Sequence, residues 1–587
     1  EALRASFGAS AMPYAADTLA RTQQRLDDWG TAWTAGHKDA CEATEVHKHQ
    51  SATLMDQRMA CLGGQLRSLD ARVKLLREAQ DEDIARAVDI LDELPDPADC
   101  ADTEALLRDR SRPDGPQAPA IRALLEQAAS AQTAHHFDDA LTATKEALDA
   151  AREHAELRLE AEALHRLAFI QLSTSKPREA AENFERAAWL AIEVDSPADA
   201  TQSFLHLMDV VGDNLGQDDA WPRWERATRA SMARMRDPDH GMEWHLENAL
   251  GGIDERNGRN QEARVHYETA LEGVRAREDG GGTLQIHLLN NLGIAYLNLG
   301  EADEALKILS EARDRYVEHY GPEHPNVATA LGNLGNAQEV TGAYDDAIAS
   351  QREALRLMTG SLPAGHIEIA SAHDNLGNAL DGAGQTEAAI EHMRTALEIR
   401  KQSMGGEDPS VGISANNLGD ALMRLGRMDE AVTHVETACK LFESGYGKDH
   451  PHTGVCLNNL ARVRHHQGRS REALAILERA LTIHRAAFGD DHPILAYHYV
   501  QRGKILRDGG RRADAIEALE RAVKLREDGG EEAMALAEAN FELAITLPQS
   551  ARIRARALAQ RACDKYREAG DAAQKELAEV EAWLETP

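Results

Sequence analysis

A short phrase that returns every 42 residues constrains the fold of this chain more than any other feature. It reads Leu-Asn-Asn-Leu-Gly in its first clear copy, and it returns with small changes at positions starting from Leu289, Leu331, His373, Ala415 and Leu457. Glycines from Gly258 to Gly510 and alanines from Ala263 to Ala515 keep the same spacing. A period of this length indicates a row of like units that pack on their neighbours, and not one compact core.

Each unit is predicted to be a helix, a tight turn and a second helix, here called helix A and helix B. The small residue at the end of the phrase lies on helix A, where it allows a neighbouring helix to approach closely. The glycine that follows, such as Gly300, suits a left-handed cap at the end of helix A. Alanines seven apart, such as Ala305 and Ala312, lie on one face of helix B. The fold class expected is therefore all-α.

A second repeated phrase joins helix B of one unit to helix A of the next. Its copies are Tyr320–Pro325, Tyr446–Pro451 and Phe488–Pro493, with a variant at Met404–Pro409. The glycine stops helix B, and proline suits the first position of the next helix. The histidine or aspartate just before proline can cap that helix. We therefore expect a structural role for these histidines.

Together these phrases resemble those of tetratricopeptide repeats, specifically the 42-residue type found in kinesin light chains. The match is most specific from about 240 to 525. The resemblance implies a right-handed superhelix, an α-solenoid, that binds other proteins. We expect residues 116–587 to form about eleven 42-residue helix pairs, with Leu125, Leu167 and Met208 continuing the phase. End units are expected to diverge because they cap the array.

The residues just before the phased leucine are the candidate peptide-binding site. The second ladder position holds Asn291, Asn333, Asn375, Asn417 and Asn459, and the first holds Asn290, Asp374, Asn416 and Asn458. The resemblance implies that helix A lines a concave groove, where a carboxamide can pair with the backbone of an extended peptide. The alternative is an architectural bond to the adjacent repeat. Neighbouring helix positions point about 100° apart, so one pair of residues can serve both roles.

The charge of the chain excludes some partners. Its formal net charge of −34 disfavours nucleic acids and anionic membrane surfaces. Within this acidic chain, residues 460–512 carry a basic patch that could receive an acidic peptide, although some of its members would pair with carboxylates such as Glu478. The members predicted are Arg462, Arg464, Arg469 and Arg502.

Residues 1–115 do not share the period and are expected to form a separate helical module. Helices are predicted at about 14–45, 52–79 and 82–93, with Ser51 as a cap at the turn of a helical hairpin. Cys41 and Cys61 are equally far from that turn, which would allow a disulfide between them. Reduced thiols are the simpler alternative. A zinc site is a third reading, and it would use His37, Cys41, His47, His49 and Cys61.

The module also resembles the region that follows the kinase domain in large bacterial Ser/Thr protein kinases with tetratricopeptide repeats. The matching residues are Trp33, Ala40–Thr44, Gln50–Ser51, Leu54, Arg58–Leu62, Leu94–Pro95 and Cys100–Asp102. The resemblance implies a kinase domain and a membrane span upstream of Glu1. This segment would then lie outside the cytoplasm, where a Cys41–Cys61 disulfide is reasonable.

No catalytic constellation is visible in this segment. It has no kinase motif, no HExxH and no phosphate-binding loop, so we expect neither an enzyme nor a cofactor here. It also lacks an apolar run of membrane-spanning length. The expected partner is a protein or an extended peptide, and a homodimer is compatible with the sequence. The function favoured is the sensory arm of a kinase. The alternatives are a standalone cytoplasmic adaptor and a metal-dependent site in residues 1–115.

Overall fold

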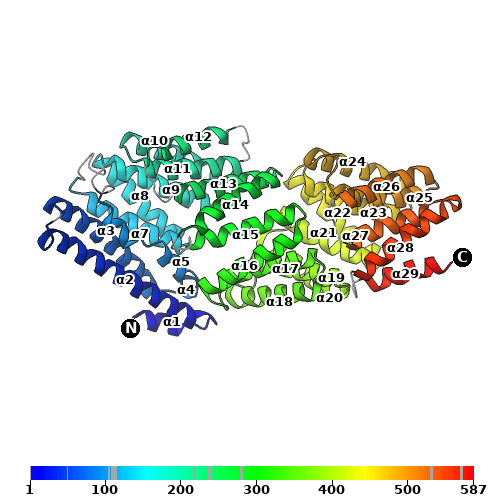
Figure 1. The fold of residues 1–587 in the computed structure, drawn as a ribbon, viewed down its shortest axis with the longest axis horizontal. Helices are drawn as coiled ribbons and strands as arrows, with labels where there is room; N and C mark the ends of the chain where they lie inside the picture. The colour runs from blue at the N-terminus through cyan, green and yellow to red at the C-terminus, as the bar shows by residue number, and fades with distance from the viewer. Residues whose placement is uncertain are drawn as a thin grey trace. The chain divides into compact units, whose positions relative to one another are not determined.

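The structure, a computed structural model, is built from helices (Figure 1). It describes residues 2–48, 50–103, 106, 115–215, 220–235, 241–277, 282–528, 533–568 and 573–586. Every regular element within these ranges is helical, which confirms the all-α fold class. None of the described helices is both long and apolar enough to cross a membrane. The helices form two compact units, residues 1–291 with 315–324, and residues 292–314 with 325–587.

The first unit begins with the N-terminal module, residues 2–101. Its long hairpin is formed by α2 and α3, and Ser51 caps α3 by accepting a hydrogen bond from the backbone N–H of Leu54 at 3.1 Å, as predicted. The third predicted helix is split at Arg86 into two short ones. The elements are α1 (Ala2–Ala9), α2 (Ala15–Glu45), α3 (Ala52–Arg77), α4 (Asp81–Ala85), α5 (Ala87–Asp92) and the 3-10 turn η1 (Pro97–Ala101).

Helical hairpins follow the module in the same unit. The two helices of each hairpin pack on one another, as α9 and α10 do in Figure 1. They are α7 (Ala118–Thr133), α8 (Phe137–Glu153), α9 (Leu157–Ser173), α10 (Pro177–Glu193), α11 (Pro197–Asp209) with the π-helical turn η2 (Val210–Asn214), α12 (Trp221–Met232), α13 (Gly241–Arg256) and α14 (Asn260–Arg275).

These first hairpins do not keep the expected 42-residue period. Helix α8 begins at Phe137 and α10 at Pro177, which is 40 residues later. The reason is that the joints are short turns, in which Ala155 and Asp195 adopt positive φ values of 54° and 58°. The longer linker with proline and histidine is missing here, and the shorter joint removes two residues from each unit.

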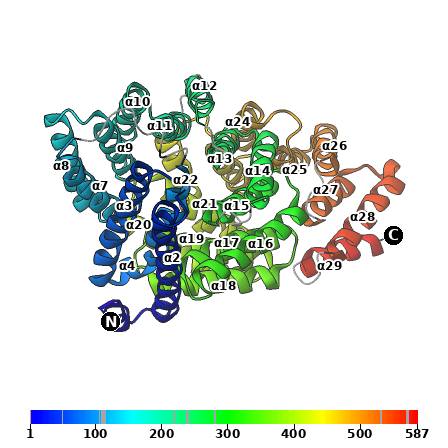
Figure 2. The same cartoon turned by 60° about the vertical axis from the view of Figure 1, so that its left-hand side comes forward.

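Two helices belong in part to each unit, α15 (Gly282–Asn298) and α16 (Ala302–Tyr320). The second unit continues with A and B helices that run side by side, such as α27 and α28 (Figure 2). The boundary predicted at residue 115 remains a prediction. The helices are α17 (Pro325–Val340), α18 (Tyr344–Ser361), α19 (Ile367–Gly382), α20 (Thr386–Met404), α21 (Pro409–Arg424), α22 (Met428–Gly445), α23 (Pro451–His466), α24 (Ser470–Phe488), α25 (Ile494–Asp508), α26 (Arg512–Asp528), α27 (Ala533–Thr546), η3 (Gln549–Ala551), α28 (Arg552–Glu568) and α29 (Gln574–Glu585).

The phased glycines and linkers act as the sequence predicts. The turn glycines from Gly258 to Gly510 have φ values between 71° and 77°, the left-handed region that favours glycine. Asp408 accepts a hydrogen bond from the N–H of Ser410 at 2.8 Å, and His450 Nδ1 accepts one from the N–H of His452 at 3.2 Å. Both residues therefore cap the helix that follows.

Close contact between helices A and B depends on the small phased residues. A Cβ added at Gly419 would lie 2.6 Å from Val435 Cγ2, and one added at Gly503 would lie 2.4 Å from Leu519 Cγ. The phased alanines Ala347 and Ala389 are fully buried in one continuous core of the second unit. Small side chains thus set the distance between the two helices of a pair.

Replacement of Ala389 by Leu should destabilise the second unit by about 1–3 kcal/mol, because the added side chain overpacks a filled helix seam. Ala388 is the matched control, since this preceding residue of the same helix is exposed. Ala388→Leu should change the free energy of unfolding little. Urea denaturation followed by circular dichroism measures both variants, and equal losses would contradict the packing argument.

The cysteines pair differently from the sequence-based expectation. Cys61 is bonded to Cys100, with Cα atoms 5.7 Å apart, and Cys41 is a free thiol. The predicted Cys41–Cys61 disulfide is therefore wrong. The reason is that η1 covers this face of α3, where Arg58 donates to the carbonyl of Cys100 at 3.1 Å. A second disulfide joins Cys439 and Cys456, whose Cα atoms are 5.4 Å apart.

The zinc reading of the module finds no support in the described residues. Among these, no cluster of three or more His, Cys, Asp and Glu side chains is arranged to hold a metal ion. Cys61 takes part in the disulfide instead, and His49 lies outside the described residues.

Candidate peptide-binding surface

The Asn ladder is partly architectural, because some of its members bond to one another between repeats. Asn459 Nδ2 on α23 donates to Asn416 Oδ1 on α21 at 3.1 Å, and both side chains are buried. In the first unit, Asn291 donates in the same way to Asn248 on α13, also at 3.1 Å. The second ladder position of one repeat thus binds the first position of the preceding repeat. These carboxamides are already satisfied within the chain.

Asp374 occupies a first ladder position and forms a buried ion pair instead. Arg400 on α20 donates to its Oδ2, and the Ser414 hydroxyl on α21 donates to the same oxygen at 2.7 Å. Burial raises the pKa of Asp374, and Arg400 only partly opposes this rise. The other carboxylate oxygen, Oδ1, is buried and has no hydrogen-bond partner among the described residues. This cluster connects α19, α20 and α21.

Asn375 and Asn417 differ from the rest of the ladder. Both side chains are half-buried, and neither makes a side-chain hydrogen bond with a described residue. The structure shows why for Asn375: its counterpart in the preceding repeat is Gly332, which offers no side chain, although a Cβ there would lie 4.0 Å from Asn375 Nδ2. For Asn417 the counterpart is Asp374, which is held by Arg400. Two adjacent repeats therefore present unused carboxamides.

The remaining ladder residues have partners. Asn458 Oδ1 lies 3.0 Å from His498 Nδ1, and His498 Nε2 lies 2.7 Å from His484 Nδ1. Burial, followed by the neighbouring His484, lowers the pKa of His498 to about 3, so this histidine is neutral. Asn290 and Asn333 are half-buried, and neither is without a partner. Asn458 is thus part of a buried polar cluster.

Each of the four arginines predicted for the basic patch lies beside a carboxylate, and the patch as a binding site remains a prediction. Arg462 is paired with Asp420, and Arg502 lies 3.4 Å from Glu478. Arg464 and Arg469 share Glu472, at 3.3 and 2.6 Å. The physical reason is that oppositely charged side chains of neighbouring helices meet in space, although the sequence groups the arginines together.

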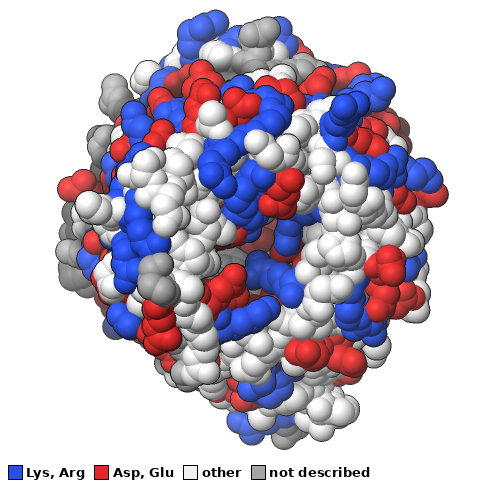
Figure 3. Space-filling model, turned by 90° about the vertical axis from the view of Figure 1, so that its right-hand side faces the viewer, with Lys and Arg blue, Asp and Glu red and all other residues white. Residues whose placement is uncertain are grey.

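Ion pairs instead follow the A helices of the second unit. Arg424 on α21 lies 3.2 Å from Asp381 on α19, and Lys504 on α25 lies 2.6 Å from Glu538 on α27. Burial opposes ionisation of Asp420, but Arg462 and Arg424 hold its pKa below the usual value. Figure 3 shows acidic and basic side chains next to one another around a hollow on the face nearest the C-terminus. A ligand of one charge sign would therefore find few uncompensated charges along these helices.

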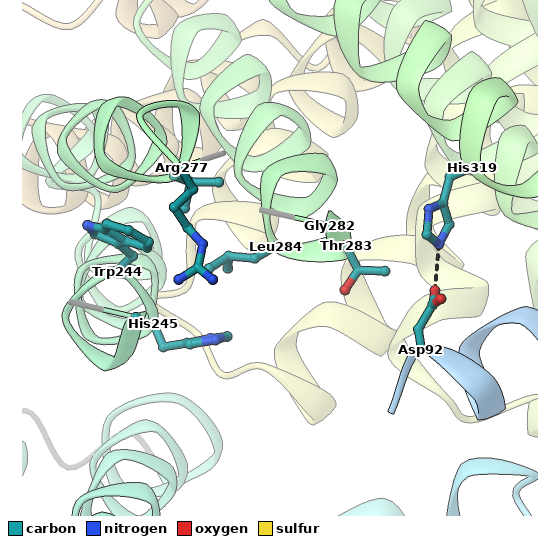
Figure 4. Close-up of a pocket in the computed structure, with 10 residues that line it drawn as sticks. Asp92, Trp244, His245, Arg277, Gly282, Thr283, Leu284 and His319 are labelled. Atoms are coloured by element: carbon teal, nitrogen blue, oxygen red, sulfur yellow. Dashed lines mark hydrogen bonds and ion pairs between the residues drawn. The ribbon is translucent and has the colours of Figure 1, made fainter. Parts of the chain in front are cut away.

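A cavity in the first unit was not predicted from the sequence. It has a volume of about 420 Å³. Figure 4 shows Trp244, His245 and Arg277 on one side and the hydrogen-bonded pair of Asp92 and His319 on the other. The pair joins residues 227 apart in the chain, so no local pattern could have indicated the cavity. Asp92 lies in the N-terminal module, where the sequence does not follow the 42-residue repeat that guided the other predictions.

Comparison with known proteins identifies the repeats. The tetratricopeptide repeat family model matches residues 284–360, 339–402, 410–486 and 457–528. No curated protein sequence matches the chain. Among solved structures, a putative kinesin light chain from Podosopora anserina with nearly identical TPR-like repeats is 22% identical, with a TM-score of 0.30, and the match covers 34% of this chain and 96% of that one.

Two further structures show the same kind of resemblance. BtubC from P. vanneervenii is 20% identical, with a TM-score of 0.32, and the match covers 40% of this chain and 91% of that one. A Rap protein complexed with competence and sporulation factor is 13% identical, with a TM-score of 0.41 and coverages of 59% and 99%. The helical hairpins, the phased glycines and the family model together identify tetratricopeptide repeats in residues 284–402 and 410–528 of this chain.

Proposed function

We propose that the chain binds an extended peptide along the A helices α19 and α21, with Asn375 and Asn417 pairing with the peptide backbone. Tetratricopeptide repeats are protein-binding scaffolds and are typically not enzymes. The observation that supports this particular site is the pair of unused carboxamides, since the equivalent side chains in other repeats, such as Asn459, are bonded within the chain.

The chemistry of a carboxamide suits a backbone ligand. Each one offers a donor and an acceptor, and can therefore pair with one N–H and one C=O of a peptide without selecting its side chains. The charges nearby are mutually compensated, as in the contact of Arg424 with Asp381 and Asp420 at 3.2 and 3.3 Å. Affinity would then come from backbone pairing and apolar contact more than from net charge.

Replacement of both Asn375 and Asn417 by Ala should weaken peptide binding at least tenfold, because two hydrogen bonds are lost. Peptides selected from a random-sequence display library against the unmodified chain serve as probes, and calorimetry gives their dissociation constants. Helicity and the midpoint of urea unfolding should change little, since these side chains have no partner to lose.

Asn416→Ala is the matched control, one residue before Asn417. It removes the acceptor of Asn459 and should lower stability by about 1–3 kcal/mol. Peptide affinity should stay nearly the same at temperatures where the control is folded. If the double variant loses stability and keeps its affinity, the two carboxamides are architectural and the proposed site is wrong.

The finer part of the proposal is that this scaffold is the sensory or regulatory arm of a bacterial Ser/Thr protein kinase. Two features favour it: the motif resemblance of residues 1–115, and the disulfides Cys61–Cys100 and Cys439–Cys456, which persist in oxidising compartments outside the cytoplasm. The coding sequence upstream of Glu1 tests the idea. A kinase domain followed by an apolar span of about 20 residues would support it, and a start codon within a few residues, with neither feature, would contradict it.

A further inference from the structure

The linker between α16 and α17, residues Tyr320–His324, is covered by the N-terminal module. The hydroxyl of Tyr320 donates to Asp89 Oδ1 at 2.6 Å, and His324 Nε2 donates to the carbonyl of Ala85 at 2.8 Å. Tyr320 is 3% exposed and His324 is fully buried. The linker therefore offers two donors, and the module supplies two acceptors four residues apart.

The two acceptors, the carbonyl of Ala85 and the carboxylate of Asp89, lie at the end of one short helix and in the first turn of the next. Ala85 is the last residue of α4, so its carbonyl has no partner inside the helix. Asp89 lies in the first turn of α5. The 320–324 linker therefore binds the C-terminal end of a helix and a carboxylate that lies four residues further along the chain.

The linker before α23, residues Tyr446–His450, has the same local geometry. Its Tyr446 and His450 rings are stacked with centroids 4.7 Å apart, compared with 4.8 Å for Tyr320 and His324. Its glycine, Gly447, has a φ of 102°, and Gly321 has a φ of 94°. The two linkers therefore hold the phenol and the imidazole in the same arrangement.

The donors of the 446–450 linker have no acceptor in the part of the chain that the structure describes. His450 Nδ1 accepts the capping hydrogen bond from the backbone of His452, so the proton of the neutral ring is on Nε2. Burial lowers the pKa of His450, which favours this neutral form. No described residue accepts a hydrogen bond from its Nε2 or from the hydroxyl of Tyr446, and Tyr446 is 39% exposed.

We propose that the 446–450 linker is a docking site for a helix end of a partner protein, one that presents a terminal backbone carbonyl and a carboxylate four residues later. The chain itself contains an example of such an occupant, since Ala85 and Asp89 bind the equivalent linker in this way. Lys448, exposed within the same linker, adds an attraction for the carboxylate. This surface is separate from the Asn ladder and does not depend on the proposed groove.

A second copy of the chain fits this surface less well than a foreign helix. In its own unit, the module gains further contacts: Arg21 donates to the carbonyl of Glu318 at 2.5 Å, and Asp92 pairs with His319 at 2.6 Å. The residue equivalent to His319 before the 446–450 linker is Gly445, which offers no side chain. A module would lose these contacts by moving to another chain.

The test uses the full chain and a terminally blocked synthetic peptide of residues 80–93, titrated by calorimetry. We expect one saturable site. Tyr446→Phe should weaken binding about tenfold, because a hydrogen bond to a carboxylate is lost. His450→Asn should weaken binding to a similar degree, because asparagine can still cap α23 but cannot present the outward donor. A peptide with Asp89→Asn should also bind about tenfold more weakly.

Two variants make the test specific. Tyr320→Phe should leave peptide affinity unchanged, since that linker is already covered. Phe488→Tyr should raise the stoichiometry from one to two, because the rings of Phe488 and His492 lie at a similar distance, 4.8 Å between centroids with a tilt of 31°, but this linker lacks the hydroxyl. Circular dichroism checks that each variant is folded.

Three outcomes would overturn the proposal. One is the absence of saturable binding, and another is binding that survives both Tyr446→Phe and His450→Asn. The third is a dimer of the chain alone, seen by sedimentation and abolished by Tyr446→Phe, because the occupant would then be a second copy.

Discussion

Replacement of Arg400 by Met should destabilise the second unit by about 3–5 kcal/mol, because the carboxylate of Asp374 would remain buried without its counter-charge. The side chains of Arg400 and Asp374 are 7% and 5% exposed, and they join α19 to α20 next to Ser414 of α21. Denaturation with urea at pH 7 measures the loss. A stability equal to that of the unmodified chain would show that water, or a different conformation, satisfies Asp374.

The loss of stability in Arg400→Met should be larger at high pH than at low pH. Burial already raises the pKa of Asp374 in the folded chain, and removal of Arg400 raises it further. The folded variant then binds a proton that the unfolded chain releases above its ordinary pKa. The deficit should therefore be largest above the folded pKa and should shrink as the pH falls toward about 4.

A second substitution separates charge from packing. The double variant Arg400→Met with Asp374→Leu should recover most of the lost stability, since a buried ion pair can often be replaced by apolar side chains of similar volume. If the double variant is no more stable than Arg400→Met, the cost comes from packing and not from the unpaired carboxylate.

Loss of the Cys61–Cys100 disulfide should destabilise the first unit by about 4 kcal/mol. The sequence separation of 39 residues closes a long loop, and on the chain-entropy account its release enlarges the unfolded ensemble. The double variant Cys61→Ser with Cys100→Ser tests this, and Cys41→Ser is the control because Cys41 is a free thiol. Denaturation under oxidising conditions compares them.

Peptide mapping of the oxidised chain gives an independent result. The fragment that contains Cys61 should be linked to the fragment that contains Cys100, with Cys41 open to alkylation. A Cys41–Cys61 link would contradict the structure. If a reductant lowers the stability of the unmodified chain but not that of the double variant, the effect belongs to this bond and not to Cys439–Cys456.

Much of the fold could be predicted because its determinants are local. The turn after each A helix needs a left-handed residue, so Gly300 and Gly384 appear in the sequence at the period of the structure, with φ values of 76° and 75°. The caps at Asp408 and His450 are equally local, since each contacts a backbone N–H two residues away. The period failed before residue 197, because short turns at Ala155 and Asp195 replace the longer linker between helix B of one unit and helix A of the next.

The candidate site could be predicted only in part, because the role of each ladder residue depends on its neighbour in the preceding repeat. Asn375 and Asn459 occupy the same sequence position, but one faces Gly332 and the other Asn416. The disulfide was missed for a similar reason. The helical hairpin indicated a partner for Cys61 on α2, but the irregular segment that carries Cys100 covers that face of α3.

The cover over the 320–324 linker has a mechanical consequence. A row of repeats under tension usually peels from its ends, because each repeat is held only by its neighbours. In the first unit, however, Asp92 and His319 are in contact although 227 residues separate them. The hairpins between them, α7 to α14, form a loop whose ends are fastened together. Force applied to the chain outside this loop would first load the contacts of Tyr320, His324 and His319 with the N-terminal module, which bear it in parallel. The hairpins inside the loop would bear force only after these contacts break.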